Sequence, residues 1–293
     1  MRAETVSWRM ANVPGNQEIV DTHTHVAISD DPHFPLSASD LTASWWTSGG
    51  TIDDVLDQLD ANGVGRLVLV QAIGAYGYDC SYAAASAAAH SNRAAFVAAV
   101  SMRADDPVAD LAALCDAPPS GAVIAGVRLF GVDGTAPAWL ADGRAAAVWD
   151  FAAEHNLVIV PTVFANEFKH LKVLAEQSPS VSVAIDHCGF TDMVEGDGQA
   201  MLFALADIPS LHLKVTSYVL EAAERDDGDA AKLIERLAEA FGANRLCWGS
   251  DHPQDQRHDY AGKLALARHA TRAFDDASRN AFFNTTASRL FFI

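Results

Sequence analysis

The chain has 293 residues, half of them hydrophobic, and 38 acidic against 20 basic side chains give it a formal net charge of −18. This charge argues against nucleic acid and against an anionic membrane surface, because both are bound through Lys and Arg. The sequence contains neither an apolar run near the roughly 20 residues that cross a bilayer nor the apolar stretch of a signal peptide at its start. We therefore expect an acidic, globular cytoplasmic protein, either a monomer or a homo-oligomer.

Short apolar runs alternate with longer amphipathic stretches along the whole chain. Three of the runs (LVLV, LVIV and VSVAI) read as apolar on both faces, which is typical of parallel strands covered by helices. The predicted strands cover residues 18–25, 66–72, 96–101, 122–129, 158–163, 181–187, 211–215 and 245–250.

The predicted helices lie between these strands. Thr51 precedes the first helix, which is expected to end at Gly63, a residue suited to the left-handed turn after a helix. The others cover residues 79–90, 142–155, 167–177, 229–241, 255–274 and 277–292. A long loop over residues 26–50, rich in Pro, Ser and Trp, separates the first strand from the first helix.

Eight strand–helix units in a chain of this length predict a (β/α)8 TIM barrel, formed as a single domain over residues 1–293 and closed by a C-terminal helix. A doubly wound open sheet is the alternative. The glycine-rich turn that would favour it is represented only by residues 74–77, which lack the G-x-G-x-x-G order.

The sequence D-T-H-T-H at residues 21–25 stands at the end of the first predicted strand. Side chains two residues apart on a strand share a face, so His23 and His25 are expected to point into the same space. The active sites of TIM barrels form at this end of the strands.

Two further strands end in similar residues. The sixth ends in I-D-H-C-G at 185–189 and the eighth in W-G-S-D-H-P at 248–253. Strand ends converge in a closed barrel, and the first and eighth strands are neighbours in the ring. We therefore expect four side chains to meet: His23, His25, His187 and Asp251.

These motifs, together with LVLVQAIGAYG at 67–77 and GVRLF at 126–130, resemble the amidohydrolase superfamily and in particular its amidohydrolase-related (family 2) branch. The resemblance covers nearly the whole chain and is nearest to the lactonases of that branch, such as pyrone-dicarboxylate and sugar-acid lactonases. It implies a hydrolase that opens a cyclic ester with water. Asp251 is then the expected general base and His187 a second catalytic residue.

The resemblance also bears on a metal cofactor. Metal-dependent members usually supply a further His or a carbamylated Lys from strand five, but V-I-V-P-T-V at 158–163 offers neither, so a binuclear centre is not expected. Three imidazoles and one carboxylate (His23, His25, His187 and Asp251) would still satisfy one Zn²⁺ or Mn²⁺. Some lactonases of the branch keep these residues and work without metal, so both a metal-bound and a metal-free site stay open.

Substrate contacts are expected from four residues. Arg128 lies in the GVR motif, where a guanidinium suits a carboxylate or a lactone carbonyl, and Lys214 lies on the seventh strand. Tyr76 and Trp46 belong to the loops after the second and first strands. Because few cations stand at strand ends, a neutral or singly charged lactone is expected rather than a dicarboxylate.

Two other functions stay open at this stage. One is a metal-dependent decarboxylase or hydratase of the same superfamily, although decarboxylases show a fuller metal set than this sequence offers. The other is a catalytically silent binding protein built on the same barrel, which would have no need for the set of three histidines and an aspartate.

Overall fold

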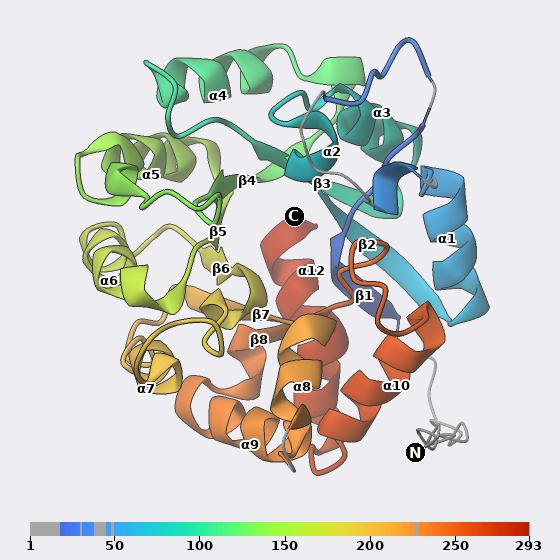
Figure 1. The fold of residues 1–293 in the computed structure, drawn as a ribbon, viewed down its shortest axis with the longest axis vertical. Coiled ribbons are helices and arrows are strands. Elements are labelled where there is room, and N and C mark those ends of the chain that lie inside the picture. The colour runs from blue at the N-terminus through green and yellow to red at the C-terminus, as the bar shows by residue number, and fades with distance from the viewer. Residues whose placement is uncertain (1–17, 30, 38–44, 48–49, 226–227, 293) are drawn as a thin grey trace.

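Eight parallel strands follow one another around a ring in chain order (Figure 1). The computed structural model describes residues 18–29, 31–37, 45–47, 50–225 and 228–292. The strands are β1 (Ile19–Thr24), β2 (Val64–Val70), β3 (Ala94–Ala99), β4 (Ile124–Phe130), β5 (Val158–Thr162), β6 (Val183–Ile185), β7 (Leu211–Thr216) and β8 (Leu246–Gly249). A parallel bridge between Thr24 and His252 joins the first strand to the end of the eighth. The predicted (β/α)8 barrel is confirmed.

Alternation along each strand divides the apolar side chains between the inside and the outside of the barrel. On β2, Val68 and Val70 belong to the interior cluster, whereas Leu67 and Leu69 belong to the large core shared with the helices. On β3, Val97 lies inside and Phe96 outside in the same way. The uninterrupted apolar runs of the sequence therefore serve two cores at once.

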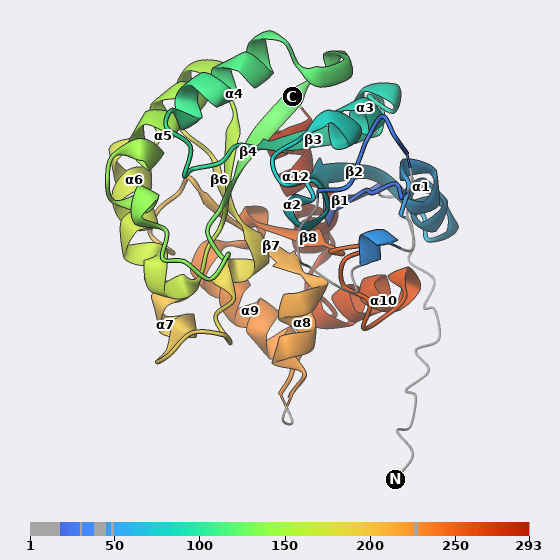
Figure 2. The same cartoon turned by 45° about the horizontal axis from the view of Figure 1, so that its top comes forward.

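Helices surround the ring of strands, except that α12 (Thr286–Phe291) lies within it at one end (Figures 1 and 2). They are α1 (Ile52–Ala61), α2 (Ile73–Tyr76), α3 (Ser81–Ala89), α4 (Pro107–Asp116), α5 (Arg144–His155), α6 (Phe168–Gln177), α7 (Gly198–Phe203), α8 (Ser217–Ala223), α9 (Ala230–Phe241), α10 (Tyr260–Ala270), α11 (Asp276–Asn280) and α12 (Thr286–Phe291). In the part of the chain that the structure describes, no helix is long and apolar enough to cross a membrane.

Local signals explain several helix boundaries. The Thr51 side chain accepts the Asp54 amide and Asp54 accepts the Thr51 amide, which forms a capping box at the start of α1. Gly63 follows the helix with φ +71°, as expected. Helix α10 is shorter than the predicted 255–274, because Asp259 caps it by accepting the Gly262 amide. Helices α4, α7 and α8 were not predicted, although Asp106 and Pro107 mark the start of α4.

The C-terminal segment closes one end of the barrel. A π-helical turn (Ala281–Thr285) connects α11 to α12, and Leu290 and Phe291 of α12 pack into the interior cluster with Val68 and Val160. At the same end, the Arg289 guanidinium donates to the Asn244 carbonyl just before β8. Helix α12 therefore seals the amino-terminal ends of the strands, and its place within the ring is visible in Figure 1.

His212, near the start of β7, makes the stability of this closed end depend on pH. Its buried ring lies with Nδ1 3.0 Å from the Ser210 carbonyl, while Arg289 lies 3.3 Å from Nε2. Burial and the nearby Arg289 charge lower the pKa of His212 to about 4. Between its ordinary pKa near 6.5 and this value, the unfolded chain binds more protons than the folded one, so stability falls as the pH falls.

Replacing His212 with Gln should remove this pH dependence. Wild type is expected to lose about 3 kcal/mol more than His212→Gln between pH 7 and pH 4, as measured by denaturant unfolding at each pH. His155→Gln, a change at an exposed histidine, serves as the control for the loss of an imidazole. Parallel pH profiles for wild type and His212→Gln would contradict the prediction.

Candidate active site

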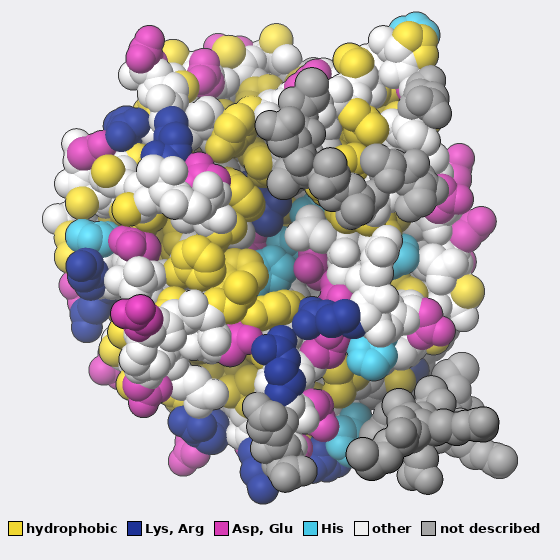
Figure 3. Space-filling view, viewed as in Figure 1, with side chains coloured by type: hydrophobic (Ala, Val, Ile, Leu, Met, Phe, Trp, Pro, Cys, Tyr) yellow, Lys and Arg dark blue, Asp and Glu magenta, His cyan; other side chains and the backbone are white. Residues whose placement is uncertain are grey.

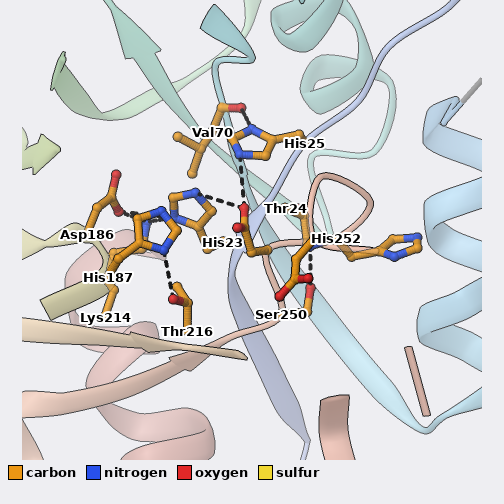
Figure 4. A network of polar contacts seen from close by, with 12 residues as sticks. His23, Thr24, His25, Val70, Asp186, His187, Lys214, Thr216, Ser250 and His252 are labelled. Carbon is orange, nitrogen blue, oxygen red and sulfur yellow. Dashed lines mark hydrogen bonds and ion pairs between the residues drawn. The ribbon is translucent and has the colours of Figure 1, made fainter. Parts of the chain in front are cut away.

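Three segments bring the predicted site residues together at the carboxyl ends of the strands. His23 lies on β1, with His25 just beyond it, His187 lies in the turn η5 (Asp186–Gly189) after β6, and Asp251 follows β8. The His23 ring centroid lies 4.9 Å from that of His25 and 4.7 Å from that of His187. Asp251 Oδ1 lies 3.5 Å from His25 Nε2 and 3.7 Å from His23 Nε2. All four side chains are buried, and Figure 4 shows the rings of His23, His25 and His187 gathered in one place.

Asp21 and Gly249 hold β1 against β8 at this point. The buried Asp21 carboxylate accepts the amides of His23 and Ser250 and the Tyr260 hydroxyl. The Asp251 amide in turn donates to the His23 carbonyl over 2.8 Å. A Cβ on Gly249 would lie 2.7 Å from His23 Cβ, so this close approach requires glycine. The glycine of the G-S-D motif therefore has a packing role.

Left-handed backbone conformations orient two of the four side chains. His187 has φ +52° and Asp251 has φ +55°, values that non-glycine residues adopt at a cost of about 1–3 kcal/mol each. Such strain is found at sites where the surroundings fix the backbone for a functional reason. Here each of the two residues stands two positions after the end of its strand, His187 after β6 and Asp251 after β8.

Each imidazole is fixed through its Nδ1 atom. His25 Nδ1 donates to the Val70 carbonyl at 2.8 Å, and its Nε2 lies 3.5 Å from Asp251 Oδ1. His187 Nδ1 lies 2.7 Å from the Thr216 hydroxyl, and burial lowers the pKa of His187. Burial would raise the pKa of Asp251, but His25, His187 and His23 together hold it below its ordinary value. Asp251 is therefore ionised at neutral pH.

A buried charge network supports His23 from behind. Asp186 Oδ1 lies 2.7 Å from Lys214 Nζ and 3.0 Å from His23 Nδ1, and Asp186 Oδ2 accepts the Thr162 hydroxyl at 2.7 Å. Arg128 Nε lies 3.4 Å from the same Oδ2. Burial would raise the pKa of Asp186, but Lys214 and then His23 hold it well below its ordinary value. Sequence reasoning missed Asp186 and Thr162, although both stand in the strand-end motifs.

The four predicted substrate residues differ in where they lie. Arg128 is buried and donates to the Thr162 hydroxyl and the Gln71 carbonyl, and Lys214 is buried against Asp186. The Tyr76 hydroxyl accepts the Ile28 amide and so anchors the segment after β1. The Trp46 ring packs edge-on against Trp45, which itself stacks on His25 at 6.1 Å. Substrate contact by these four residues stays a prediction.

Part of the long loop that carries Trp46, namely residues 30, 38–44 and 48–49, lies outside the described residues.

An aromatic wall, which sequence reasoning missed, stands beside His187. It consists of Phe164, Phe190 and Tyr218. The Phe190 ring stacks on His187 at 4.6 Å and contacts Phe164 at 5.6 Å and Tyr218 at 5.5 Å. Each of the three is partly exposed. In Figure 3, hydrophobic side chains border a hollow whose floor carries histidine, acidic and basic side chains.

The site fits one divalent cation. His23 Nε2, His25 Nε2 and Asp251 Oδ1 are buried, and none of them has a hydrogen-bond partner among the described residues. His23, His187 and Asp251 offer ligand atoms within 4.8 Å of one another. Imidazole nitrogen and carboxylate oxygen are ligands that Zn²⁺ accepts, and each ring is held through its other nitrogen, as metal-binding histidines are. Strand β5 reads V-I-V-P-T and offers neither a histidine nor a lysine as a further ligand.

Comparison with known proteins places the chain in a family. Residues 20–293 match the family model described as Amidohydrolase, so the protein belongs to this family and is a hydrolase. It is 27% identical over 240 residues to an L-fucono-1,5-lactonase from Burkholderia ambifaria, an alignment that covers 80% of each chain.

Two solved structures share the fold. One is a probable 2-pyrone-4,6-dicarboxylic acid hydrolase from Acinetobacter baumannii with citric acid bound, at a TM-score of 0.75 and 19% identity, covering 94% of this chain and 100% of that one. The other is an amidohydrolase from Burkholderia multivorans with bound zinc, at a TM-score of 0.76 and 20% identity, covering 94% and 99%.

Proposed function

We propose that the protein hydrolyses a lactone, with Asp251 as the general base. One observation carries this proposal: an ionised, buried carboxylate faces two imidazole Nε2 atoms at 3.5 and 3.7 Å, and none of the three atoms is used within the described structure. Such a cluster is suited to hold and deprotonate a water molecule. The match to the Amidohydrolase family and the resemblance to a lactonase support the same reaction.

The reaction can be followed through this chain's own residues. Asp251 takes a proton from water as the water oxygen attacks the lactone carbonyl carbon. The developing oxyanion is stabilised by hydrogen-bond donors at the base of the hollow, and His23 Nε2, which lies 3.7 Å from Asp251 Oδ1, is placed to supply one. Protonated Asp251 then returns the proton to the ring oxygen as the ester C–O bond breaks. The product is a hydroxy acid, and Asp251 is again a carboxylate.

A divalent cation would be held by His23, His25, His187 and Asp251. When bound, such a cation supplies Lewis acidity, which polarises the ester carbonyl and lowers the pKa of water. The lowered pKa of water would assist Asp251. A carboxylate whose pKa lies below its ordinary value is a weak base toward water that no cation activates.

The surroundings favour a neutral or singly charged lactone. The Arg128 charge is paired with Asp186, and its donors reach Thr162 and the Gln71 carbonyl. The wall of Phe164, Phe190 and Tyr218 instead offers ring faces, on which the carbon face of a sugar-like ring can pack. A sugar lactone therefore fits these walls better than a dianionic pyrone does.

A lactone panel followed with a pH indicator tests the proposal. It should contain neutral aldonolactones of five- and six-membered rings and a dianionic pyrone, each assayed with the purified protein, the chelator-treated protein and Asp251→Asn. We expect turnover of a neutral lactone that Asp251→Asn abolishes.

The chelator arm of the assay distinguishes the two forms of the site. Activity that a chelator removes and zinc restores identifies a working metal, and chelator-resistant activity identifies a metal-free site. Release of CO₂ from an unsaturated acid with no lactone turnover would instead establish a decarboxylase. Tight lactone binding without any turnover would establish a binding protein.

A further inference from the structure

Lys214 makes an unusual contact with one of the four site residues. Its Nζ lies 2.8 Å from His23 Nδ1 and 2.7 Å from Asp186 Oδ1, while Nδ1 and Oδ1 lie 3.0 Å apart (Figure 4). All three side chains are fully buried. Two different groups thus compete for a single ring nitrogen of His23.

The two contacts require opposite tautomers. An ammonium group has three donors and no acceptor, so at 2.8 Å from Lys214 the Nδ1 atom must accept a hydrogen bond. A neutral imidazole then carries its only hydrogen on Nε2. If His23 Nδ1 instead donates to Asp186, Nε2 is left with a lone pair, which is the form that binds a metal.

We propose that Lys214 holds His23 in the tautomer with hydrogen on Nε2. His23 then donates a hydrogen bond into the site, whereas His25, whose Nδ1 donates to Val70, presents an acceptor there. Lys214 is thus a positioning residue that weakens the binding of a divalent cation and leaves a donor for the developing oxyanion. This inference concerns the site on which the proposed hydrolysis rests, and its tests use no substrate.

Zinc affinity of the metal-free protein provides the first test, measured at pH 8 by competition with a chromophoric chelator. Lys214→Met and Lys214→Gln remove the same positive charge from the same place, but the Gln amide still offers a donor to His23 Nδ1. We expect both variants to bind zinc more tightly than wild type, and Lys214→Met to bind about tenfold more tightly than Lys214→Gln. Equal affinities for the two variants would show that Lys214 acts only through its charge and would overturn the tautomer assignment.

A ¹⁵N NMR spectrum of the metal-free, histidine-labelled protein at pH 8 provides the second test, and it reads the tautomer directly in wild type. In wild type we expect a pyrrole-like signal from His23 Nε2 and a pyridine-like signal from Nδ1, identified by their loss in His23→Gln. In Lys214→Met the two signals should exchange character. A protonated Nδ1 in wild type would overturn the inference. A failed lactone screen would leave both readouts unaffected, so the two proposals fail separately.

Discussion

Asp251→Asn is expected to lower kcat by about 10²- to 10⁴-fold on whichever lactone the protein turns over, because an amide cannot accept a proton from water. Asparagine has nearly the same shape as aspartate, and the main-chain bond from residue 251 to the His23 carbonyl is kept. The folded structure should therefore survive, with unchanged circular dichroism and a Tm within a few degrees of wild type. Initial rates at saturating substrate measure the effect.

Asp255→Asn is the matched control for this experiment. Asp255 is a buried carboxylate of the same loop, and it pairs with Arg257 rather than with the histidines. This variant should keep kcat within about threefold of wild type, since it does not touch the reacting atoms. Full activity in Asp251→Asn would exclude Asp251 as the base.

Asp186→Ala is expected to destabilise the protein by about 3–5 kcal/mol, because it leaves the buried charges of Lys214 and Arg128 without their counter-ion. The free energy of unfolding, measured with denaturant, provides the readout. Adding Lys214→Met to Asp186→Ala should recover part of the loss, because the double variant buries one unpaired cation fewer.

The exposed pair Lys172–Glu176 on α6 is the control for a surface ion pair. Glu176→Ala should change the free energy of unfolding by no more than about 1 kcal/mol, since water already screens that pair. If Asp186→Ala also lost no more than about 1 kcal/mol, the result would contradict the proposed role of the Asp186 carboxylate as the counter-ion of Lys214 and Arg128.

The strands could be predicted from the sequence because parallel barrel strands are buried on both faces and leave continuous apolar runs. The meeting of His23, His25, His187 and Asp251 could be predicted from topology, since a closed ring brings the first and eighth strands side by side. The order of the strands in the ring and the position of each residue at a strand end were sufficient for the second prediction.

The support of the site could not be predicted in this way. The contact of Asp186 with Lys214, His23 and Thr162 depends on the register of β1, β5, β6 and β7, which local patterns do not specify. Phe190 reaches His187 because residues 187, 188 and 190 adopt left-handed conformations. The sequence I-D-H-C-G-F does not predict these conformations at its non-glycine residues. Helix α7 was also not predicted. It has six residues, fewer than two helical turns, so the spacing of its apolar residues cannot reveal a helical period.

The seal that α12 forms with Leu290 and Phe291 has a kinetic consequence. In the described structure the barrel is filled at that end, so a ligand reaches Asp251 only from the opposite end. In the proposed reaction, the lactone and the hydroxy acid then use the same entrance, and a product molecule still in the hollow keeps the next substrate out. Inhibition by product should accordingly be competitive with substrate, and the rate at which the new carboxylate escapes past the aromatic wall sets an upper limit on turnover.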